Sequence, residues 1–386
     1  MHLAKLIRPL RNSLVPMLLA MAALATPSDA PAEWRQITPG LTLEFPRDHG
    51  AHRDTQTEWW YLTGQLESAD GRRFGFQFTI FRRGLAAGPI NDDSSPLRAR
   101  QVLAGHFALT DVASGRTHFV ERLRRMGSPL ASAADDDLDL TVENWSLRRS
   151  EEDRLELRAS DLAAGIGLQL DLVPTKPLVL HGKDGYSAKG SQPGNASAYS
   201  SWTRLASSGT IRIGNETLAV NGEAWFDHEF GTSVLEPGVV GWDWFGLQLA
   251  DGSDLMLFVL RREDGIAPKT AAGTLVTADG KVQALAGEDF SVEAKSTWLS
   301  PQSGASYPAS WSISVPSADL AFEVVPVVAD CELRSAGSTD VVYWEGPVEL
   351  RELSTRLGEQ APSQSTRLGR GYAELTGYAG TMQGRF

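Results

Sequence analysis

The chain has 386 residues, a formal net charge of −12 at pH 7 and a single cysteine, Cys331. An acidic surface of this kind argues against nucleic acid and anionic membranes as partners. One cysteine excludes an intrachain disulfide, so the folded protein must rely on its apolar core.

The first thirty residues predict an export signal. Lys5, Arg8 and Arg11 form a basic region, and residues 14–25 form an apolar run followed by small residues. This run is too short to cross a bilayer, which needs about 20 residues, so an uncleaved anchor helix is the less favoured alternative. We expect residues 1–30 to be removed and the mature protein to be periplasmic or secreted.

Short apolar or alternating runs follow the signal, and Gly, Asn and Asp turns separate them. Such runs predict strands at residues 59–66, 74–81, 105–111, 138–147, 155–160, 167–173, 210–213, 242–249, 254–260, 274–277 and 311–315. Residues 128–137 are predicted to form an exposed loop, and residues 182–200 a long loop. The density of short strands predicts an all-β fold of barrels or sandwiches.

One pattern occurs twice. Residues 60–66 and residues 244–249 each form an aromatic-led run that leads into an Asp-Gly turn and then an apolar strand ending in Arg. Two such units far apart suggest a duplicated β-domain, and chance similarity between two hairpins is the alternative. We place the domains at residues 36–232 and 233–386.

The first segment with chemical interest surrounds the consecutive residues Trp59 and Trp60. Side chains alternate along a strand, so Glu58 and Trp60 share one face and Trp59 and Tyr61 share the other. One aromatic pair therefore points into a barrel. The outer pair must be covered by a loop or by the other domain.

His49 and His52 precede this strand at a spacing compatible with a metal ion. A pair of loop histidines without a clear third ligand is a weak signal. We therefore predict no metal site and interpret both histidines as structural.

The second segment is residues 222–231. If it is extended, Trp225, Asp227 and Glu229 share one face, and His228 points to the other. Two carboxylates close together raise the pKa of one of them, which can create a general acid. Alternatively, both carboxylates pair with arginines such as Arg82 or Arg261 across the domain junction.

Three further segments combine aromatic and acidic residues. Trp242 and Trp244 share a face, and Asp243 lies on the opposite one. Residues 342–346 read Val-Tyr-Trp-Glu-Gly. Residues 371–378 alternate polar and small or apolar side chains, as in a barrel strand with a polar face.

Together, in this order, these segments resemble the AttH-type proteins, which are related to hydroxyneurosporene synthase, the carotenoid 1,2-hydratase. The blocks that carry the resemblance are His-Gly-Ala-His with Glu-Trp-Trp-Tyr, Trp-Phe-Asp-His-Glu-Phe-Gly, Gly-Trp-Asp-Trp-Phe and Tyr-Trp-Glu-Gly, between residues 45 and 378. The resemblance implies two tandem lipocalin-like barrels and an apolar pocket. In some relatives this pocket serves water addition to an isoprenoid alkene, and other relatives look like cyclases of polyenes.

The family is often labelled a secreted hydrolase, but the sequence holds no Gly-x-Ser-x-Gly elbow, His-Glu-x-x-His motif, phosphate loop or dinucleotide fingerprint. Alkene hydration needs an acid, aromatic faces for the cation and a water molecule, and a carboxylic acid among Trp and Tyr rings supplies the first two. We therefore expect a cofactor-free, hydratase-like monomer that acts on a long hydrophobic isoprenoid or lipid. The alternative is a non-catalytic periplasmic lipid carrier or chaperone that serves a transporter.

The residues assigned to the site fall into three groups. The catalytic candidates are Asp227, His228 and Glu229. The ligand-binding candidates are Trp59, Trp60, Tyr61, Gln77, Trp225, Trp242, Trp244, Tyr343 and Trp344. The structural or site-supporting candidates are His49, His52, Glu58, Arg82, His106, Asp243, Glu345, Tyr372 and Glu374. Catalytic candidates that line an apolar cavity together would favour the enzyme, and catalytic candidates tied to arginines would favour the carrier.

Overall fold

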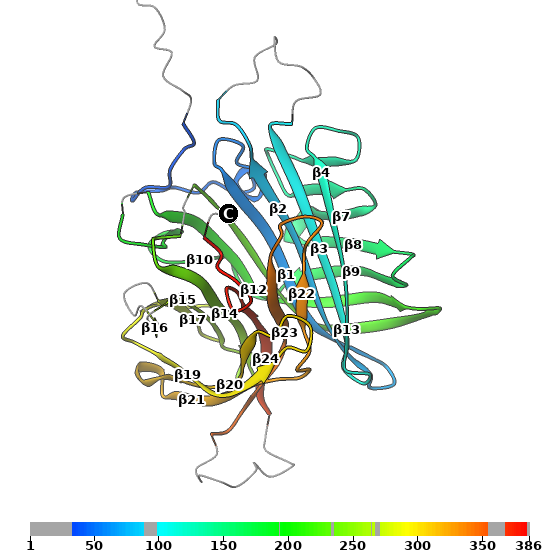
Figure 1. Cartoon of the computed structure of the whole chain (residues 1–386), viewed down its shortest axis with the longest axis vertical. Helices are drawn as coiled ribbons and strands as arrows, with labels where there is room; N and C mark the ends of the chain where they lie inside the picture. Colours follow the sequence, from blue (N-terminus) through cyan, green and yellow to red (C-terminus); the bar gives the residue numbers. More distant parts are fainter. Residues whose placement is uncertain are drawn as a thin grey trace, which may run out of the picture. The chain divides into compact units, whose positions relative to one another are not determined.

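The computed structural model describes residues 33–88, 99–192, 194–232, 235–263, 265–266, 271–353 and 367–383, and the predicted signal, residues 1–30, lies outside them. Strands dominate this part of the chain (Figure 1). Its helical turns are short 3-10 segments, namely η1 (Arg47–His49), η2 (Glu151–Asp153) and η4 (Pro316–Ala318). Within these ranges, no helix has the length and apolar character that a membrane crossing requires.

The first sheet is an antiparallel, nearly closed barrel. Its strands run in the order β4-β3-β2-β1-β13-β12-β9-β8-β7-β6-β5, with β10 and β11 also paired to β12. Their bounds are β1 (Thr57–Ser68), β2 (Arg73–Gly84), β3 (Gln101–Asp111), β4 (Arg116–Arg125), β5 (Ala131–Ala133), β6 (Asp139–Val142), β7 (Trp145–Arg149), β8 (Leu155–Asp161), β9 (Ile166–Pro174), β10 (Val179–Leu180), β11 (Tyr186–Ala188), β12 (Ala196–Ile213) and β13 (Glu216–Gly231).

The second sheet is an antiparallel half-barrel. Its order is β18-β17-β15-β14-β24-β23-β21-β20-β19, with β16 paired to β15 and β22 to β23. Their bounds are β14 (Val239–Leu249), β15 (Asp254–Arg262), β16 (Gly265–Ile266), β17 (Ala272–Val276), β18 (Val282–Ala286), β19 (Ser291–Leu299), β20 (Ser306–Val315), β21 (Leu320–Pro326), β22 (Glu332–Arg334), β23 (Val342–Arg351) and β24 (Arg367–Leu375).

The two sheets share a pairing scheme. In each, the first strand pairs with both the second and the last strand: β1 with β2 and β13, and β14 with β15 and β24. The strands β1 and β14 are those that contain the repeated sequence pattern. The fold is therefore two tandem lipocalin-like barrels, and the chain passes from one to the other between Gly231 and Val239.

Each sheet has its own core, and a third apolar cluster joins them. Trp60 and Trp145 are fully buried in the first core, and Trp311 and Trp344 in the second. The joining cluster includes Trp244, whose ring meets Tyr61 edge to face at 5.2 Å between centroids. Such aromatic pairs add about 0.5–1.5 kcal/mol beyond their buried area. The outer aromatic pair of β1, Trp59 and Tyr61, is therefore covered by the second sheet.

Three predictions of local structure need correction. Residues 138–147 form a hairpin of β6 and β7, because Glu143 adopts a positive φ of 58° that ends the first strand. Residues 128–137 contain β5, whose Ala131 and Ala133 are buried against β6. Residues 182–200 contain β11 and the start of β12, since their Ser and Ala side chains fit buried positions between paired strands.

Candidate functional site

A cavity lies at the junction of the two sheets and measures about 1130 Å³ with its open mouth. Alternate residues of β1, β2, β12 and β13 form one wall, and residues of β14, β15, β23 and β24 form the other. Eight of the lining side chains are aromatic, two are leucines and nine are polar or charged, and they are Thr57, Trp59, Tyr61, Gln77, Thr79, Phe81, Lys189, Ser197, Tyr199, Asp227, Glu229, Leu235, Trp242, Trp244, Phe258, Leu260, Tyr343, Glu345 and Glu374. An apolar hollow with a few converging polar groups is the usual form of a small-molecule site.

Asp227 is the best-anchored acid of this cavity. Its Oδ2 accepts a hydrogen bond from the Tyr199 hydroxyl (2.6 Å), and its Oδ1 accepts one from Trp225 Nε1 (2.6 Å) and another from the Ser201 hydroxyl. Burial raises the pKa of Asp227 to about 7, although these three donors act in the opposite direction. A carboxyl with this pKa can both give and accept a proton near neutrality.

Glu229 faces the same cavity but is differently held. Its Oε1 lies 3.0 Å from Lys189 Nζ and accepts a hydrogen bond of 2.5 Å from the Ser197 hydroxyl. The Lys189 ammonium also lies over the rings of Tyr199 and Phe258. This ion pair fixes Lys189 at the cavity wall.

Two further acids enter the cavity from the second sheet. Burial raises the pKa of Glu374 to about 7, the Trp242 indole opposes this shift with a hydrogen bond of 3.2 Å, and the charges of Asp227 and Glu229 add to it. Burial and the charge of Glu374 raise the pKa of Glu345 well above its ordinary value. Both were assigned only supporting roles from the sequence, but their side chains line the cavity.

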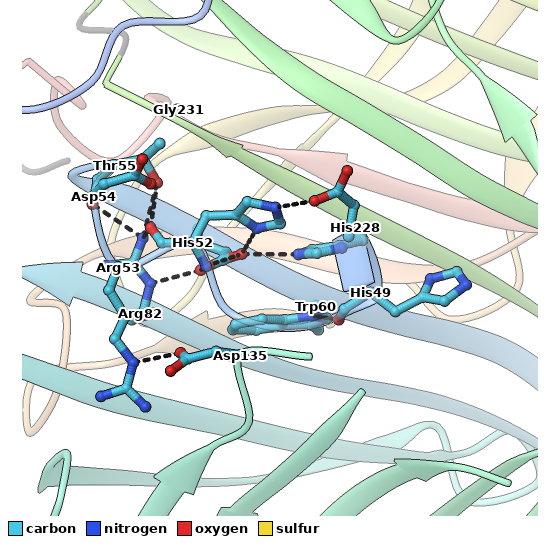
Figure 2. A network of polar contacts seen from close by, with 12 residues as sticks. His49, His52, Arg53, Asp54, Thr55, Trp60, Arg82, Asp135, His228 and Gly231 are labelled. Atoms are coloured by element: carbon cyan, nitrogen blue, oxygen red, sulfur yellow. Dashed lines mark hydrogen bonds and ion pairs between the residues drawn. The ribbon is translucent and has the colours of Figure 1, made fainter. Parts of the chain in front are cut away.

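The third catalytic candidate, His228, points away from the cavity into the first barrel, as strand alternation predicts. Its Nε2 lies 3.0 Å from Glu58 Oε1, and the same oxygen lies 2.8 Å from His52 Nδ1. Arg82 Nε bonds the other Glu58 oxygen at 2.6 Å. Figure 2 shows His52, His228 and Arg82 in this network. The ring of Trp60 stacks on that of His228, with centroids 4.9 Å apart.

His52, Glu58 and His228 are also close enough for a metal ion, with their donor atoms within 4.8 Å of one another. His52 Nδ1 and His228 Nε2 both contact Glu58 Oε1, whereas His228 Nδ1 has no hydrogen-bond partner among the described residues. Arg82 contributes a buried positive charge 2.6 Å from Glu58, and a cation would have to overcome its repulsion. The geometry therefore favours a hydrogen-bonded charge network.

This network holds the start of β1. Burial alone would lower the pKa of His52, but hydrogen bonds to Asp48 Oδ1 (3.0 Å) and Glu58 raise it. His49 stacks on Trp202, and its backbone oxygen accepts a hydrogen bond from Trp60 Nε1 (3.0 Å). These residues therefore support the cavity wall from behind.

Three ligand-binding candidates do not line the cavity. Trp60 is buried in the first core because it shares the inner face of β1 with Glu58. Trp344 is buried in the second core, where its Nε1 donates to the Ala329 carbonyl at 2.7 Å. Trp225 lies in the apolar cluster that joins the two sheets, where its Nε1 donates to Asp227 Oδ1 at 2.6 Å. The other ligand-binding candidates, Trp59, Tyr61, Gln77, Trp242, Trp244 and Tyr343, line the cavity.

The remaining supporting candidates lie around the cavity. His106 Nδ1 lies 2.8 Å from the Tyr343 hydroxyl and positions that ring. Tyr372 is buried in the cluster that joins the sheets. Asp243 lies on the opposite face of β14 from the cavity, where it bonds Arg261 Nε at 2.9 Å and Tyr378.

The alternative in which Asp227 and Glu229 pair with Arg82 or Arg261 is wrong. Arg82 bonds Glu58, and Arg261 bonds Asp243. Asp227 has hydroxyl and indole partners instead, because β13 turns it toward the cavity and away from the charged network.

Sequence reasoning missed several lining residues. Tyr199, Ser197 and Lys189 fell within the stretch of residues 182–200 interpreted as a long loop, where no strand face could be assigned. Thr79 and Phe81 could have been found, because they continue the alternation that begins at Gln77 in β2.

No curated protein sequence matches the chain. Among solved structures, a protein described as an AttH from Nitrosomonas europaea is 34% identical, with a TM-score of 0.77, and the match covers 89% of this chain and 99% of that one. Kievitone hydratase from Nectria haematococca shares the fold at 14% identity and a TM-score of 0.64, over 91% and 98% of the two chains. The AttH-like family model matches residues 36–378. The chain therefore belongs to the AttH-like family.

Proposed function

We propose that this protein binds a long hydrophobic isoprenoid or lipid in the cavity and adds water across one of its carbon–carbon double bonds. The reaction needs a proton donor, a surface that tolerates a carbocation and a route for water, and no cofactor. The observation that carries the proposal is the position of Asp227, a buried carboxyl with a pKa of about 7 in an aromatic cavity.

In the proposed reaction, protonated Asp227 transfers its proton to one alkene carbon, and the adjacent carbon becomes cationic. The faces of Trp59, Trp242 and Trp244 attract a cation through their ring quadrupoles. Water attacks the cationic carbon and forms a carbon–oxygen bond. The Asp227 carboxylate then accepts the proton that the bound water loses, which restores the starting state.

The ligand must tolerate the charges of the cavity. Lys189 is already paired with Glu229, and three more carboxyl groups line the walls. An uncharged ligand avoids repulsion by these acids, and protonated carboxyls can donate hydrogen bonds to its oxygen atoms. The name of kievitone hydratase, a fold relative, supports water addition as the reaction. Because the sequence predicts an export signal, we also propose that the reaction occurs outside the cytoplasm.

The first test identifies the ligand. Native mass spectrometry of protein purified from its own host should detect a co-purified isoprenoid or lipid. Incubation of the apoprotein with that molecule should then yield a product heavier by one water. A bound ligand that stays chemically unchanged would favour the carrier.

The second test assigns the acid. Asp227→Asn should reduce turnover about 100-fold or more, because it removes the proton donor. Ligand affinity should change little, since the aromatic walls are intact. Glu229→Gln is the matched control in the same strand and cavity, and it should retain most of the turnover. Turnover that survives Asp227→Asn would remove this residue from the mechanism.

A further inference from the structure

We propose that His181 is a positioning residue for Asp227: it exchanges its ring proton between Nε2 and Nδ1, so that Asp227 stays hydrogen-bonded in both protonation states. The proposal deepens the proposed function, because an acid that cycles between two states needs partners for both. It concerns a histidine that neither the sequence pattern nor the cavity lining singles out.

His181 follows β10 and bonds one residue of each sheet. Its Nε2 lies 2.7 Å from the Ser201 hydroxyl oxygen in the first sheet, and its Nδ1 lies 2.8 Å from the Thr274 hydroxyl oxygen in the second. The ring packs on Tyr199 with centroids 4.1 Å apart. His181, Ser201 and Thr274 are all at most 1% exposed, so bulk water does not supply alternative partners.

The chain of hydrogen bonds has one direction when Asp227 is ionised. Ser201 donates to Asp227 Oδ1, so its oxygen must accept from His181, which places the ring proton on Nε2. His181 Nδ1 then has a free lone pair and accepts from the Thr274 hydroxyl. In this state, the hydrogen bonds from Asp227 through Ser201 and His181 to Thr274 all run in one direction.

The direction reverses when Asp227 becomes protonated. Each proton then moves one step along the hydrogen bonds: the Thr274 hydroxyl gives its proton to His181 Nδ1, Nε2 gives its proton to Ser201, Ser201 gives its proton to Asp227 Oδ1, and a proton from solvent replaces the one that Thr274 gave. The ring proton is now on Nδ1, where it is donated to Thr274, and Ser201 donates to Nε2. Asp227 has gained one proton, whereas Ser201, His181 and Thr274 each carry the same number of protons as before.

The other oxygen of Asp227 has no such adaptable partner. Oδ2 accepts from the Tyr199 hydroxyl, and the Tyr199 oxygen already accepts from Trp244 Nε1 at 3.1 Å. A proton on Oδ2 would force the Tyr199 hydroxyl to turn away from the carboxyl. Oδ1 is therefore the favoured position for the proton.

The ring itself stays neutral throughout. Burial, together with the nearby positive charge of Lys189, lowers the pKa of His181 to about 3. A neutral imidazole has one donor and one acceptor nitrogen, which is the property the chain requires. The charge of Glu229 raises the pKa of Asp227, and the charges of Asp227 and Glu229 raise the pKa of Glu374. Lys189, which is paired with Glu229, is the charged group that acts on His181.

Nitrogen NMR of the imidazole rings tests the inference without a substrate. The full-length protein is labelled with ¹⁵N-histidine, and His181→Phe, which keeps a ring against Tyr199, identifies the His181 signals among the seven histidines. We expect the protonated nitrogen to change from Nε2 to Nδ1 as the pH falls through about 7, the pKa of Asp227. The change should occur without double protonation of the ring.

Four variants test which group drives the tautomer change. Asp227→Asn should hold His181 in one tautomer at every pH, and Ser201→Ala should uncouple the ring from Asp227. Ser201→Thr restores the hydroxyl and should restore the change. Glu374→Gln, which removes the other acid with a pKa of about 7, should leave the change in place.

A His181 tautomer that is constant from about pH 5 to 9 in the native protein would overturn the inference, and so would a doubly protonated ring near pH 7. A change that survives Asp227→Asn would overturn it as well. The result is separable from the proposed function: a tautomer change in a protein without hydratase turnover would refute the reaction and keep the role of His181.

Discussion

Gln65 and Gln248 occupy matching positions in the two copies of the repeated pattern, and each bonds the backbone of the opposite sheet. Gln65 Nε2 donates to the carbonyls of Val348 (2.9 Å) and Gly371 (2.8 Å). Gln248 Nε2 donates to the carbonyls of Thr203 (2.8 Å) and Ala224 (3.0 Å). The duplication therefore joins the barrels by reciprocal contacts and fixes the two walls of the cavity relative to each other.

The first prediction follows from this pair. Gln248→Ala leaves two buried carbonyls unpaired and should lower the free energy of unfolding by about 1–3 kcal/mol. Gln65→Ala should have a similar or smaller effect, because Gln65 is only half-buried. Urea denaturation measures both, with the exposed Gln302→Ala as the control. Unfolding midpoints equal to that of the native protein would contradict a joining role.

The second prediction concerns pH and turnover. The proposed acid works in its protonated form, and the pKa of Asp227 is about 7. Turnover at saturating ligand should therefore fall as the pH rises through about 7. The ligand affinity, followed by Trp fluorescence, should change less over the same range. A rate that increases with pH would indicate that Asp227 acts as a base in the first step.

The third prediction concerns Glu345. Burial raises its pKa well above the ordinary value of 4.5, so the folded state keeps a proton that the unfolded state loses above pH 4.5. Stability is then lost as the pH rises from 4.5 toward the folded pKa. Glu345→Gln removes this penalty, so its melting temperature should exceed that of the native protein by more at pH 8 than at pH 5. The exposed control Glu352→Gln should show no such trend.

The fourth prediction concerns the network behind the cavity wall. Glu58 and Arg82 are each about 1% exposed, and removing one partner leaves an uncompensated buried charge. Arg82→Ala should therefore cost about 3–5 kcal/mol of folding free energy. The exposed pair of Lys295 and Glu293 offers a control, and Lys295→Ala should cost at most about 1 kcal/mol. Equal effects of the two substitutions would contradict a structural role for the buried network.

The same network predicts a pH trend. The pKa of His52 is raised above its ordinary 6.5 by Asp48 and Glu58, against the effect of burial. Its stabilising contribution is complete below pH 6.5 and is lost as the pH rises through the folded pKa. His52→Gln should flatten the decline of melting temperature above pH 6.5. An unchanged decline would show that other groups cause it.

The fifth prediction concerns export. Expression in a bacterium with a periplasm should yield a mature protein whose first residue lies between about residue 26 and residue 31. Sequencing of its N-terminus checks this. Intact Met1 in a soluble cytoplasmic fraction would refute the signal.

Local sequence patterns predicted the all-β class and the face on which many side chains lie, and the family resemblance implied the two barrels. Strand alternation has a period of two, so the separation of Trp59 and Tyr61 from Trp60, and of Asp227 from His228, follows from local order alone. The same rule located most of the aromatic cavity wall.

The hydrogen-bond partners of the site residues could be read only from the three-dimensional fold. Asp227 bonds Tyr199 and Ser201 across neighbouring strands, and His181 links Ser201 to Thr274 of the other barrel. Glu345 and Glu374 join the site from the end of the chain. Sequence spacing carries no information on these contacts, because they depend on strand order and on how one sheet docks on the other. Burial then raises the acids' pKa values, and burial is a property of the assembled fold.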